Sequence, residues 1–222
     1  MANKVVGYLG LDNYENIFYL ARILYHLDKK VLLVEHSESL SLQLSVPIPK
    51  NLDCEKTVIT YRGIDFTSQI VNDQMLAEYD AVIISYGFGQ RFEDLGLCSN
   101  IIVVTDLHSH NTYRIQRLFS AYFSTIEVEI SLHIKDIVDC KITPETIAKN
   151  TTQTVPFDHI SILYHDTQDL KNALLCQYNS IFKFTKVTKQ LKNYLWNEII
   201  DWYPEIESKV IKKAYTKARR GD

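Results

Sequence analysis

The feature that most constrains the fold is a repeated alternation of short aliphatic runs with longer stretches of helical periodicity. Residues 5–9 form an apolar run typical of a buried strand, and residues 31–34 form another. Between them, apolar residues recur at three- and four-residue spacing, which predicts one apolar helix face: Ile17, Leu20, Ala21, Leu24 and Leu27. Such a strand–helix–strand unit of about 30 residues predicts two parallel strands joined by a right-handed crossover.

The same alternation continues along the chain. We expect further strands at residues 81–84, 101–104, 126–134 and 159–164, and helices at residues 113–123, 169–178, 185–202 and 205–219. Pro47 and Pro49 interrupt residues 37–75, where we expect a loop with short strands. The sequence therefore predicts an α/β fold with a mainly parallel sheet flanked by helices on both faces, in three α/β/α layers.

Charge divides the chain into two parts. Residues 183–222 contain 10 Lys and Arg against 5 Asp and Glu, whereas the whole chain has a net charge of −3. We expect an α/β domain at residues 1–182 and a basic helical extension at residues 183–222, packed on that domain or projecting from it. No signal sequence or bilayer-length apolar run is apparent, and the four cysteines contain no CxxC pair, so we expect a cytoplasmic protein.

Ligands of such sheets collect at the carboxyl ends of the strands. Residues 7–13 occupy the first strand-to-helix turn in this interpretation, and no Lys or Arg lies between Lys4 and Arg22, while Asp12 and Glu15 are acidic. One like-charge contact at about 4 Å costs on the order of 4 kcal/mol. The helix dipole contributes less than about 1 kcal/mol in favour of an anion. Repulsion of a triphosphate should therefore dominate at this turn.

At these positions the order of elements resembles that of the MinD/ParA group of P-loop ATPases, which use a deviant Walker A loop and dimerise around nucleotide. Under this resemblance the signature lysine falls on Tyr8, the phosphate-binding lysine on Asn13, and the magnesium-binding Ser or Thr on Tyr14. Glu35 stands where the family has an acidic residue that positions water or metal, and Ser85 replaces the Walker B aspartate. The resemblance therefore implies a degenerate relative that lacks both lysines and the Walker B carboxylate.

The candidate site follows from this alignment. We expect a degenerate nucleotide loop, or an interface in its place, at Gly7, Gly10, Leu11, Asp12, Asn13, Tyr14 and Glu15. Switch-like positions are expected at Glu35, Ser85, Tyr86, Gly87, Phe88 and Asp106. Aromatic residues on these loops, among them Tyr14, Tyr86, Phe88 and Phe92, suit a protein interface.

Two catalytic alternatives are disfavoured by spacing. Asp106, His108 and His110 could hold a metal, but two histidines two residues apart do not share a helix face, and no Cys is near. Ser85 with His108 and Asp106 could form a hydrolase triad, but Ser85 lacks a Gly-x-Ser-x-Gly elbow. Asp106 and His108 also lie too close in sequence to orient one another easily.

The extension offers a second candidate surface. A basic partner patch is expected on one amphipathic helix, at Lys209, Lys212, Lys213, Lys217, Arg219 and Arg220. A weak contact with DNA phosphates or a membrane surface, a protein partner, and ordinary solvation all fit this pattern. Recruitment to a membrane or to the nucleoid would follow from the first two.

Three functions remain open from the sequence. The first is a non-catalytic pseudo-ATPase without a cofactor, which acts as a homodimeric scaffold, positioning or regulatory protein for secretion or pilus, division or plasmid-partition machinery. The second is a divergent ATPase that binds ATP and Mg²⁺ and takes its lysine from elsewhere in the chain or from a partner. The third is a small-molecule sensor that uses the vacated pocket.

Overall fold

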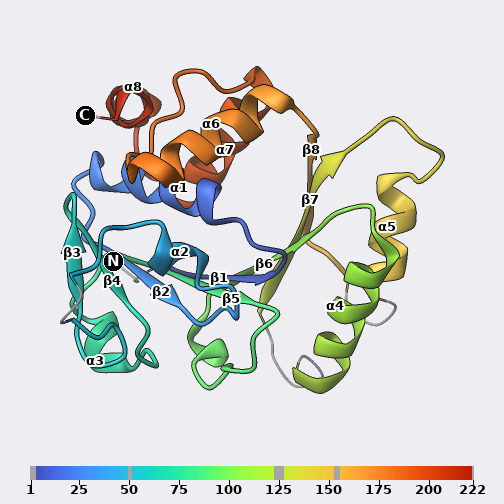
Figure 1. Cartoon of the computed structure of the whole chain (residues 1–222), viewed down its shortest axis with the longest axis horizontal. Helices are drawn as coiled ribbons and strands as arrows, with labels where there is room; N and C mark the ends of the chain where they lie inside the picture. The colour runs from blue at the N-terminus through green and yellow to red at the C-terminus, as the bar shows by residue number, and fades with distance from the viewer. Residues whose placement is uncertain (1–3, 50–51, 123–127, 153–155, 222) are drawn as a thin grey trace.

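A computed structural model describes residues 4–49, 52–122, 128–152 and 156–221. Its centre is an eight-stranded sheet in the order β3-β4-β2-β5-β1-β6-β7-β8 (Figure 1). All neighbouring strands are parallel except the β3–β4 hairpin at one edge. The strands are β1 (Lys4–Gly10), β2 (Val31–Glu35), β3 (Ile59–Tyr61), β4 (Ile64–Thr67), β5 (Ala81–Gly87), β6 (Asn100–Thr105), β7 (Glu129–Ile137) and β8 (His159–Tyr164).

Helices cover both faces of the sheet. One apolar cluster joins the sheet to α1, α6, α7 and α8, and a second joins the opposite face to α4 and α5 (Figure 1). The helices are α1 (Tyr14–Tyr25), α2 (Ser41–Leu44), α3 (Asp73–Leu76), α4 (Ser109–Tyr122), α5 (Pro144–Thr151), α6 (Thr167–Asn179), α7 (Lys189–Trp202) and α8 (Ser208–Arg220), with a short 3-10 helix at Leu95–Leu97. The predicted three-layer, mainly parallel α/β fold is confirmed.

Alternation of side chains along β1 explains the two clusters. Val6 and Tyr8 contribute to the cluster under α1 and α7, whereas Val5 and Leu9 contribute to the opposite one. Both faces of the central strands are therefore apolar, and this is why these strands appear in the sequence as unbroken aliphatic runs.

Several predicted elements have different bounds in the structure. The helix expected from residue 185 begins instead at Lys189, because the Thr188 side chain accepts a hydrogen bond from the Leu191 amide and caps the helix there. Phe184 and Val187 precede that cap as buried residues of the core. The strand expected at residues 126–134 is β7, which starts at Glu129 and continues to Ile137; residues 126 and 127 lie outside the described part. Helix α5 has no counterpart among the expected elements.

The two C-terminal helices are part of the packed structure. Leu195 and Ile199 of α7 and Ile211 and Ala214 of α8 are almost completely buried in the cluster that also contains α1. The basic extension therefore packs on the domain, α7 directly on the sheet and α8 on α1, and does not project from it. Across the described ranges, the structure contains no helix with the length and apolar character needed to cross a membrane.

Candidate functional site

The first strand-to-helix turn is much shorter than residues 7–13, the range expected from the sequence. β1 continues to Gly10 and α1 begins at Tyr14, so the turn consists only of Leu11, Asp12 and Asn13. The Leu11 amide donates to the Val104 carbonyl (2.9 Å), which holds the start of the turn against β6. A P-loop spans eight residues from its first glycine to its Ser or Thr. Three residues cannot wrap a phosphate group in the same way.

Gly7 and Tyr8 are strand residues and do not belong to this turn. A Cβ atom at Gly7 would lie 2.9 Å from the Tyr86 ring and 3.1 Å from the Cys98 sulfur, so this glycine allows neighbouring side chains to pack closely. Tyr8, the position aligned with the signature lysine, is buried beneath α7, and burial raises its pKa. Gly10 does have a turn role: its φ is +102°, and a Cβ there would lie 2.3 Å from the Val104 carbonyl oxygen.

The beginning of α1 has no side-chain cap. Asn13 occupies the N-cap position, but its Oδ1 accepts from Nδ2 of Asn16 (2.8 Å) and no backbone amide of the first helical turn donates to it. Both asparagines are buried. Neither Asp12 nor Asn13 therefore caps this helix through its side chain.

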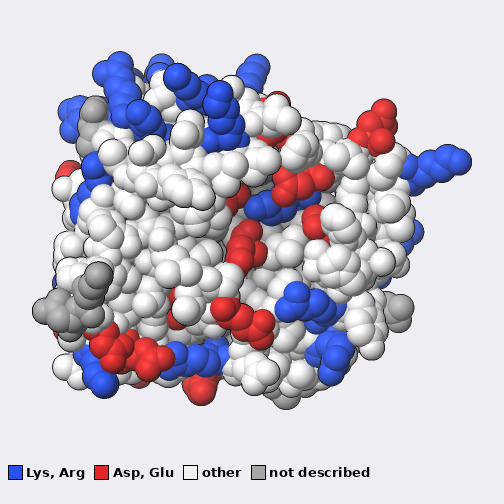
Figure 2. All heavy atoms as spheres, in the orientation of Figure 1, with Lys and Arg blue, Asp and Glu red and all other residues white. Residues whose placement is uncertain are grey.

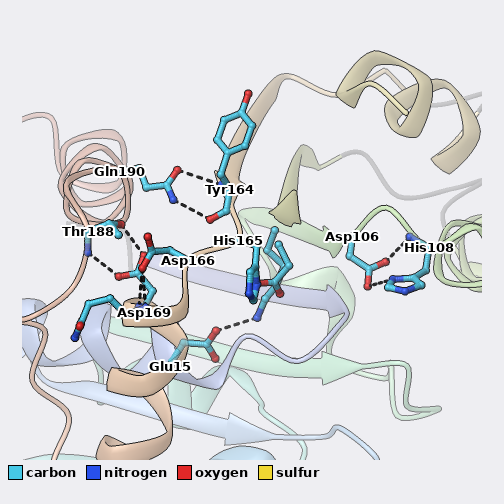
Figure 3. A network of polar contacts seen from close by, with 12 residues as sticks. Glu15, Asp106, His108, Tyr164, His165, Asp166, Asp169, Thr188 and Gln190 are labelled. Carbon is cyan, nitrogen blue, oxygen red and sulfur yellow. Dashed lines mark hydrogen bonds and ion pairs between the residues drawn. The ribbon is translucent and has the colours of Figure 1, made fainter. Parts of the chain in front are cut away.

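A lysine that the sequence interpretation missed reaches this turn from a distant strand. Lys135 of β7 donates from Nζ to the Glu15 carboxylate (2.9 Å) and to the Asp12 carbonyl (3.2 Å). Figure 3 shows Glu15 at the start of α1 with this contact as a dashed line. Burial lowers the pKa of Lys135, but the attraction of Glu15 outweighs it and the pKa is raised. The lysine is thus charged and already neutralised by Glu15 in the first helical turn of α1.

Carboxylates surround this ion pair, and each has a partner within the protein. Asp166 caps α6 by accepting from the Gln168 amide (2.7 Å), and Asp169 accepts from both the amide and the hydroxyl of Thr188 (each 2.6 Å), as Figure 3 shows. Together with Asp12, Glu15, Lys135 and Asp136 they line a cavity of about 180 Å³. Ligand pockets usually measure about 300–1,000 Å³. This cavity is acidic and too small for a nucleotide.

A chain of short hydrogen bonds joins the first turn to the loop after β2. The Ser39 hydroxyl donates to Asp12 Oδ1 (2.8 Å), and Ser39 contacts Ser37 (3.0 Å), whose hydroxyl donates to Glu35 (2.6 Å). The Leu42 amide also donates to Glu35 (2.6 Å). Burial raises the pKa of Glu35, although these donors oppose the rise. Glu35 therefore holds its own loop in shape, with its oxygens occupied by protein donors.

The switch-like positions on β5, which are Ser85, Tyr86 and Gly87, are all buried. Ser85 is buried within the strand, and Tyr86 is fully buried with its hydroxyl donating to Asp94 (2.8 Å). Phe92 is also buried, so Tyr86 and Phe92 are core residues and do not form an exposed interface. Gly87 ends the strand with a φ of +56°.

Phe88 is half-buried beside a hollow in front of the first turn. The Arg114 guanidinium of α4 stacks over its ring at 3.6 Å. The hollow measures about 320 Å³ and is lined by Gly10, Leu11, Asp12, Ser37, Glu38, Ser39, Phe88 and Arg114. The structure thus brings together Gly10, Leu11, Asp12 and Phe88 among the predicted residues. It adds Ser37 and Ser39, which follow the carboxyl end of β2, and Arg114 of α4.

Asp106 is engaged at the start of α4. Its carboxylate accepts from the His108 amide (2.9 Å) and from Nδ2 of Asn111 (3.0 Å), and it contacts Nδ1 of His108 at 2.8 Å (Figure 3). Burial raises the pKa of Asp106, but these bonds outweigh it and the pKa is lowered. Contrary to expectation, two residues of separation do allow Asp106 to orient His108. Within the described residues, no hydrogen bond joins Ser85 to His108, and no group of three His, Cys, Asp or Glu could hold a metal ion.

The predicted basic patch lies on α8, but its members face different surroundings. Lys213 and Lys217 line a cleft between α8 and α1, whereas Lys209 and Lys212 are exposed outside it. Arg219 is partly buried and its carbonyl accepts from the Phe184 amide. Figure 2 shows Lys and Arg side chains gathered over the region where Figure 1 places α8, and acidic side chains around the hollow near the centre of the view.

Comparison with known proteins found similarity only at the level of structure. No protein-family model and no curated protein sequence matches the chain. Among solved structures, the Pyrococcus furiosus cell division ATPase MinD aligns with a TM-score of 0.59 and 12% identity over 93% of this chain and 100% of that one. Apo McdA from Cyanthece gives 0.57 and 11% over 95% and 98%, and a ParA family ATPase from Chlorobium tepidum gives 0.55 and 14% over 98% and 99%. The chain therefore has the fold of the MinD/ParA group of P-loop ATPases.

Proposed function

We propose that the chain is a non-catalytic protein with the MinD/ParA fold, which acts as a dimeric scaffold, positioning or regulatory protein for a larger assembly. This proposal depends mainly on the turn between β1 and α1, which is short and whose neighbouring lysine already has a partner. Only three residues separate β1 from α1, and the cation that reaches them, Lys135, is paired with Glu15. A triphosphate would have to displace this ion pair and approach several carboxylates.

Relatives in fold show what such a protein could do. MinD from Aquifex aeolicus has been solved as a MinC:MinD cell division protein complex, and MinD from Pyrococcus horikoshii has been solved with Mg-ADP. Partner binding and nucleotide binding thus occur on the same fold. We infer that this chain retains the first and has lost the second, because the lysine at its strand-to-helix turn is already paired with Glu15.

Nucleotide titration tests the loss of binding. We expect isothermal titration calorimetry with ATP or ADP, with and without Mg²⁺, to give no saturable heat, and phosphate release to stay at the level of buffer. Thermal unfolding in the presence of each nucleotide should show no rise in melting temperature. A dissociation constant in the micromolar range, or turnover above background, would contradict the proposal.

A divergent ATPase is the second candidate, and Lys135 is the observation that favours it. Its Nζ lies at the beginning of α1, where a phosphate-binding lysine is needed, and α1 has no side-chain cap. This candidate predicts that Glu15→Gln frees the lysine and tightens ATP binding, whereas Lys135→Met abolishes it. The scaffold proposal predicts that neither substitution produces binding, because the turn remains three residues long.

Dimerisation is the remaining part of the proposal. We place the interface at the hollow in front of the first turn, where Arg114 stacks on Phe88 and exposed Tyr113 lies beside it on α4. Analytical ultracentrifugation without nucleotide should show a concentration-dependent dimer. Arg114→Asp should weaken it, whereas Arg117→Asp, an equal charge change at an exposed position of α4 outside the hollow, should not. A strict monomer would overturn the dimeric part alone.

A further inference from the structure

A large cleft lies at the opposite end of α1 from the candidate site. It measures about 1,050 Å³, at the upper end of the range for small-molecule pockets. Three elements form its walls: the last turn of α1 with the residues after it, the turn between β3 and β4, and α8. Its charged lining residues are the cations Arg22, Lys29, Lys30, Arg62, Lys213 and Lys217 and the single acid Asp28. We call this the basic cleft.

One wall of the basic cleft is fixed by a buried arginine. Arg22 is only 5% exposed, donates to the Arg62 carbonyl (2.8 Å), and lies over the Tyr25 ring at 5.0 Å. The β3–β4 turn that it holds has left-handed backbone at Arg62 (φ +52°) and Gly63 (φ +77°). A Cβ at Gly63 would lie 2.2 Å from the Tyr25 ring. The turn is thus packed against α1 in a position that leaves the Arg62 side chain exposed at the cleft.

The second wall is one face of α8. Ile211, Ala214 and Ala218 are buried on the side of the core, which leaves Lys213 and Lys217, one helical turn apart, on the cleft. α8 contains no acidic residue, and within the described residues no ion pair involves any of its basic side chains. These charges are thus not neutralised by carboxylates of the fold.

We propose that the basic cleft binds a compact polyphosphate anion. Cations from three elements converge on one concave surface, and several phosphate groups close together are the anions that such convergent charge recognises best. A flat or convex partner would instead meet the outward-facing lysines of α8, which lie outside the cleft. Insertion of α8 into a membrane would need a broad apolar face, and Val210 is the only large apolar residue of the described part of α8 that is exposed.

Inorganic tripolyphosphate is the probe for this site, measured by isothermal titration calorimetry with the full-length protein at low ionic strength. The variant K213E/K217E should bind it at least about tenfold more weakly, because two charge-assisted contacts are lost. The matched control is K209E/K212E, which changes the charge of the same helix equally outside the cleft and should bind like the unaltered chain. Arg62→Ala tests the opposite wall and should also weaken binding.

Three results would overturn the proposal: no saturable binding of tripolyphosphate, equal weakening by the two double variants, or no effect of Arg62→Ala. Parallel titrations with a short DNA duplex and with anionic lipid vesicles distinguish other partners. Binding of duplex or vesicles that both double variants weaken equally, without tripolyphosphate binding, would assign these charges to a diffuse surface contact. Circular dichroism of each variant verifies that it is folded. The test is independent of nucleotide binding at the first turn.

Discussion

The two ends of α1 carry opposite charge, and they differ in how far those charges are paired within the protein. At the N-terminal end, Asp12 and Glu15 with Asp136, Asp166 and Asp169 line a small cavity, and each has a partner within the protein or lies beside Lys135. At the C-terminal end, cations line a large cleft that contains one acid. This pattern is the one that stabilises a helix dipole. It is the reverse of what a phosphate-binding turn requires, where anions from outside must meet the helix N-terminus.

The difference indicates which end can accept a ligand. Charges at the acidic end are consumed by internal ion pairs and hydrogen bonds, so a ligand there would have to break them. At the basic cleft, Lys30 pairs with the exposed Glu78 (3.8 Å), and the basic side chains of α8 form no ion pair among the described residues. An anion could therefore enter the cleft with less disruption of internal contacts. The predictions below test this contrast through stability, in order of decreasing effect.

The largest effect should come from the glycine that forms the short turn at the acidic end. Gly10→Ala forces a φ of +102° on a residue with a Cβ and places that atom 2.3 Å from a backbone oxygen, which cannot move aside. We expect a loss of about 3 kcal/mol in the free energy of unfolding, measured by urea denaturation.

Gly63→Ala at the basic cleft is the matched comparison. The atom that it meets belongs to the Tyr25 ring, which is 39% exposed and can rotate away. We expect a loss of about 1 kcal/mol. Equal losses at the two glycines would show that the acidic end is no more rigidly built than the basic cleft.

The ion pair at the acidic end should have the next largest effect. Lys135→Met leaves Glu15 without its partner in a site where both side chains are less than one fifth exposed. We expect a loss of about 2 kcal/mol, less than for a fully buried pair. In a double-mutant cycle with Glu15→Gln, the coupling energy should be about 1 kcal/mol or more.

The pH dependence of this coupling has a definite sign. Burial lowers the pKa of Lys135, Glu15 raises it, and the net shift is upward. A cation whose pKa is raised in the folded state stabilises the protein below its ordinary pKa, about 10.4, and loses that contribution as the pH rises through the folded value. The coupling should therefore be constant from about pH 6 to pH 9 and disappear only in stronger alkali. A coupling near zero at neutral pH would mean that Lys135 is available to a ligand.

Sequence patterns were sufficient to predict the layers of this fold, but they did not predict which charged side chains meet. Unbroken aliphatic runs such as residues 101–104 identify central strands because both faces of those strands are covered. The two glycines near the first turn led to a predicted loop that is too long. Gly7 allows close packing within the strand, and of the two only Gly10 has a positive φ. A glycine needed for packing and a glycine needed for a turn look alike in one sequence.

The surroundings of neither end of α1 could have been predicted from the local sequence. Lys135 reaches Glu15 across 120 positions, and Arg22 holds Arg62 across 40. The basic residues of α8 were visible as a patch, but their separation into Lys213 and Lys217 inside the cleft and Lys209 and Lys212 outside it depends on how the helix packs on α1. Helical periodicity predicts an apolar face; it does not say which neighbouring element that face meets.

The smallest expected effect tests the basic cleft in the absence of any anion. Lys213 lies one turn from both Lys209 and Lys217, and like charges at this spacing destabilise a helix by about 0.2–0.5 kcal/mol for each pair. Lys213→Glu should therefore increase the free energy of unfolding by about 0.5 kcal/mol. Lys212→Glu has one cation at this spacing, Lys209 three residues before it, and should change the free energy of unfolding by less. If Lys213→Glu is destabilising instead, the lysine has a partner in the folded protein. If it stabilises the chain while it weakens tripolyphosphate binding, the cations of the cleft are held together at a cost in stability, which is expected of a binding site and not of a solvated helix surface.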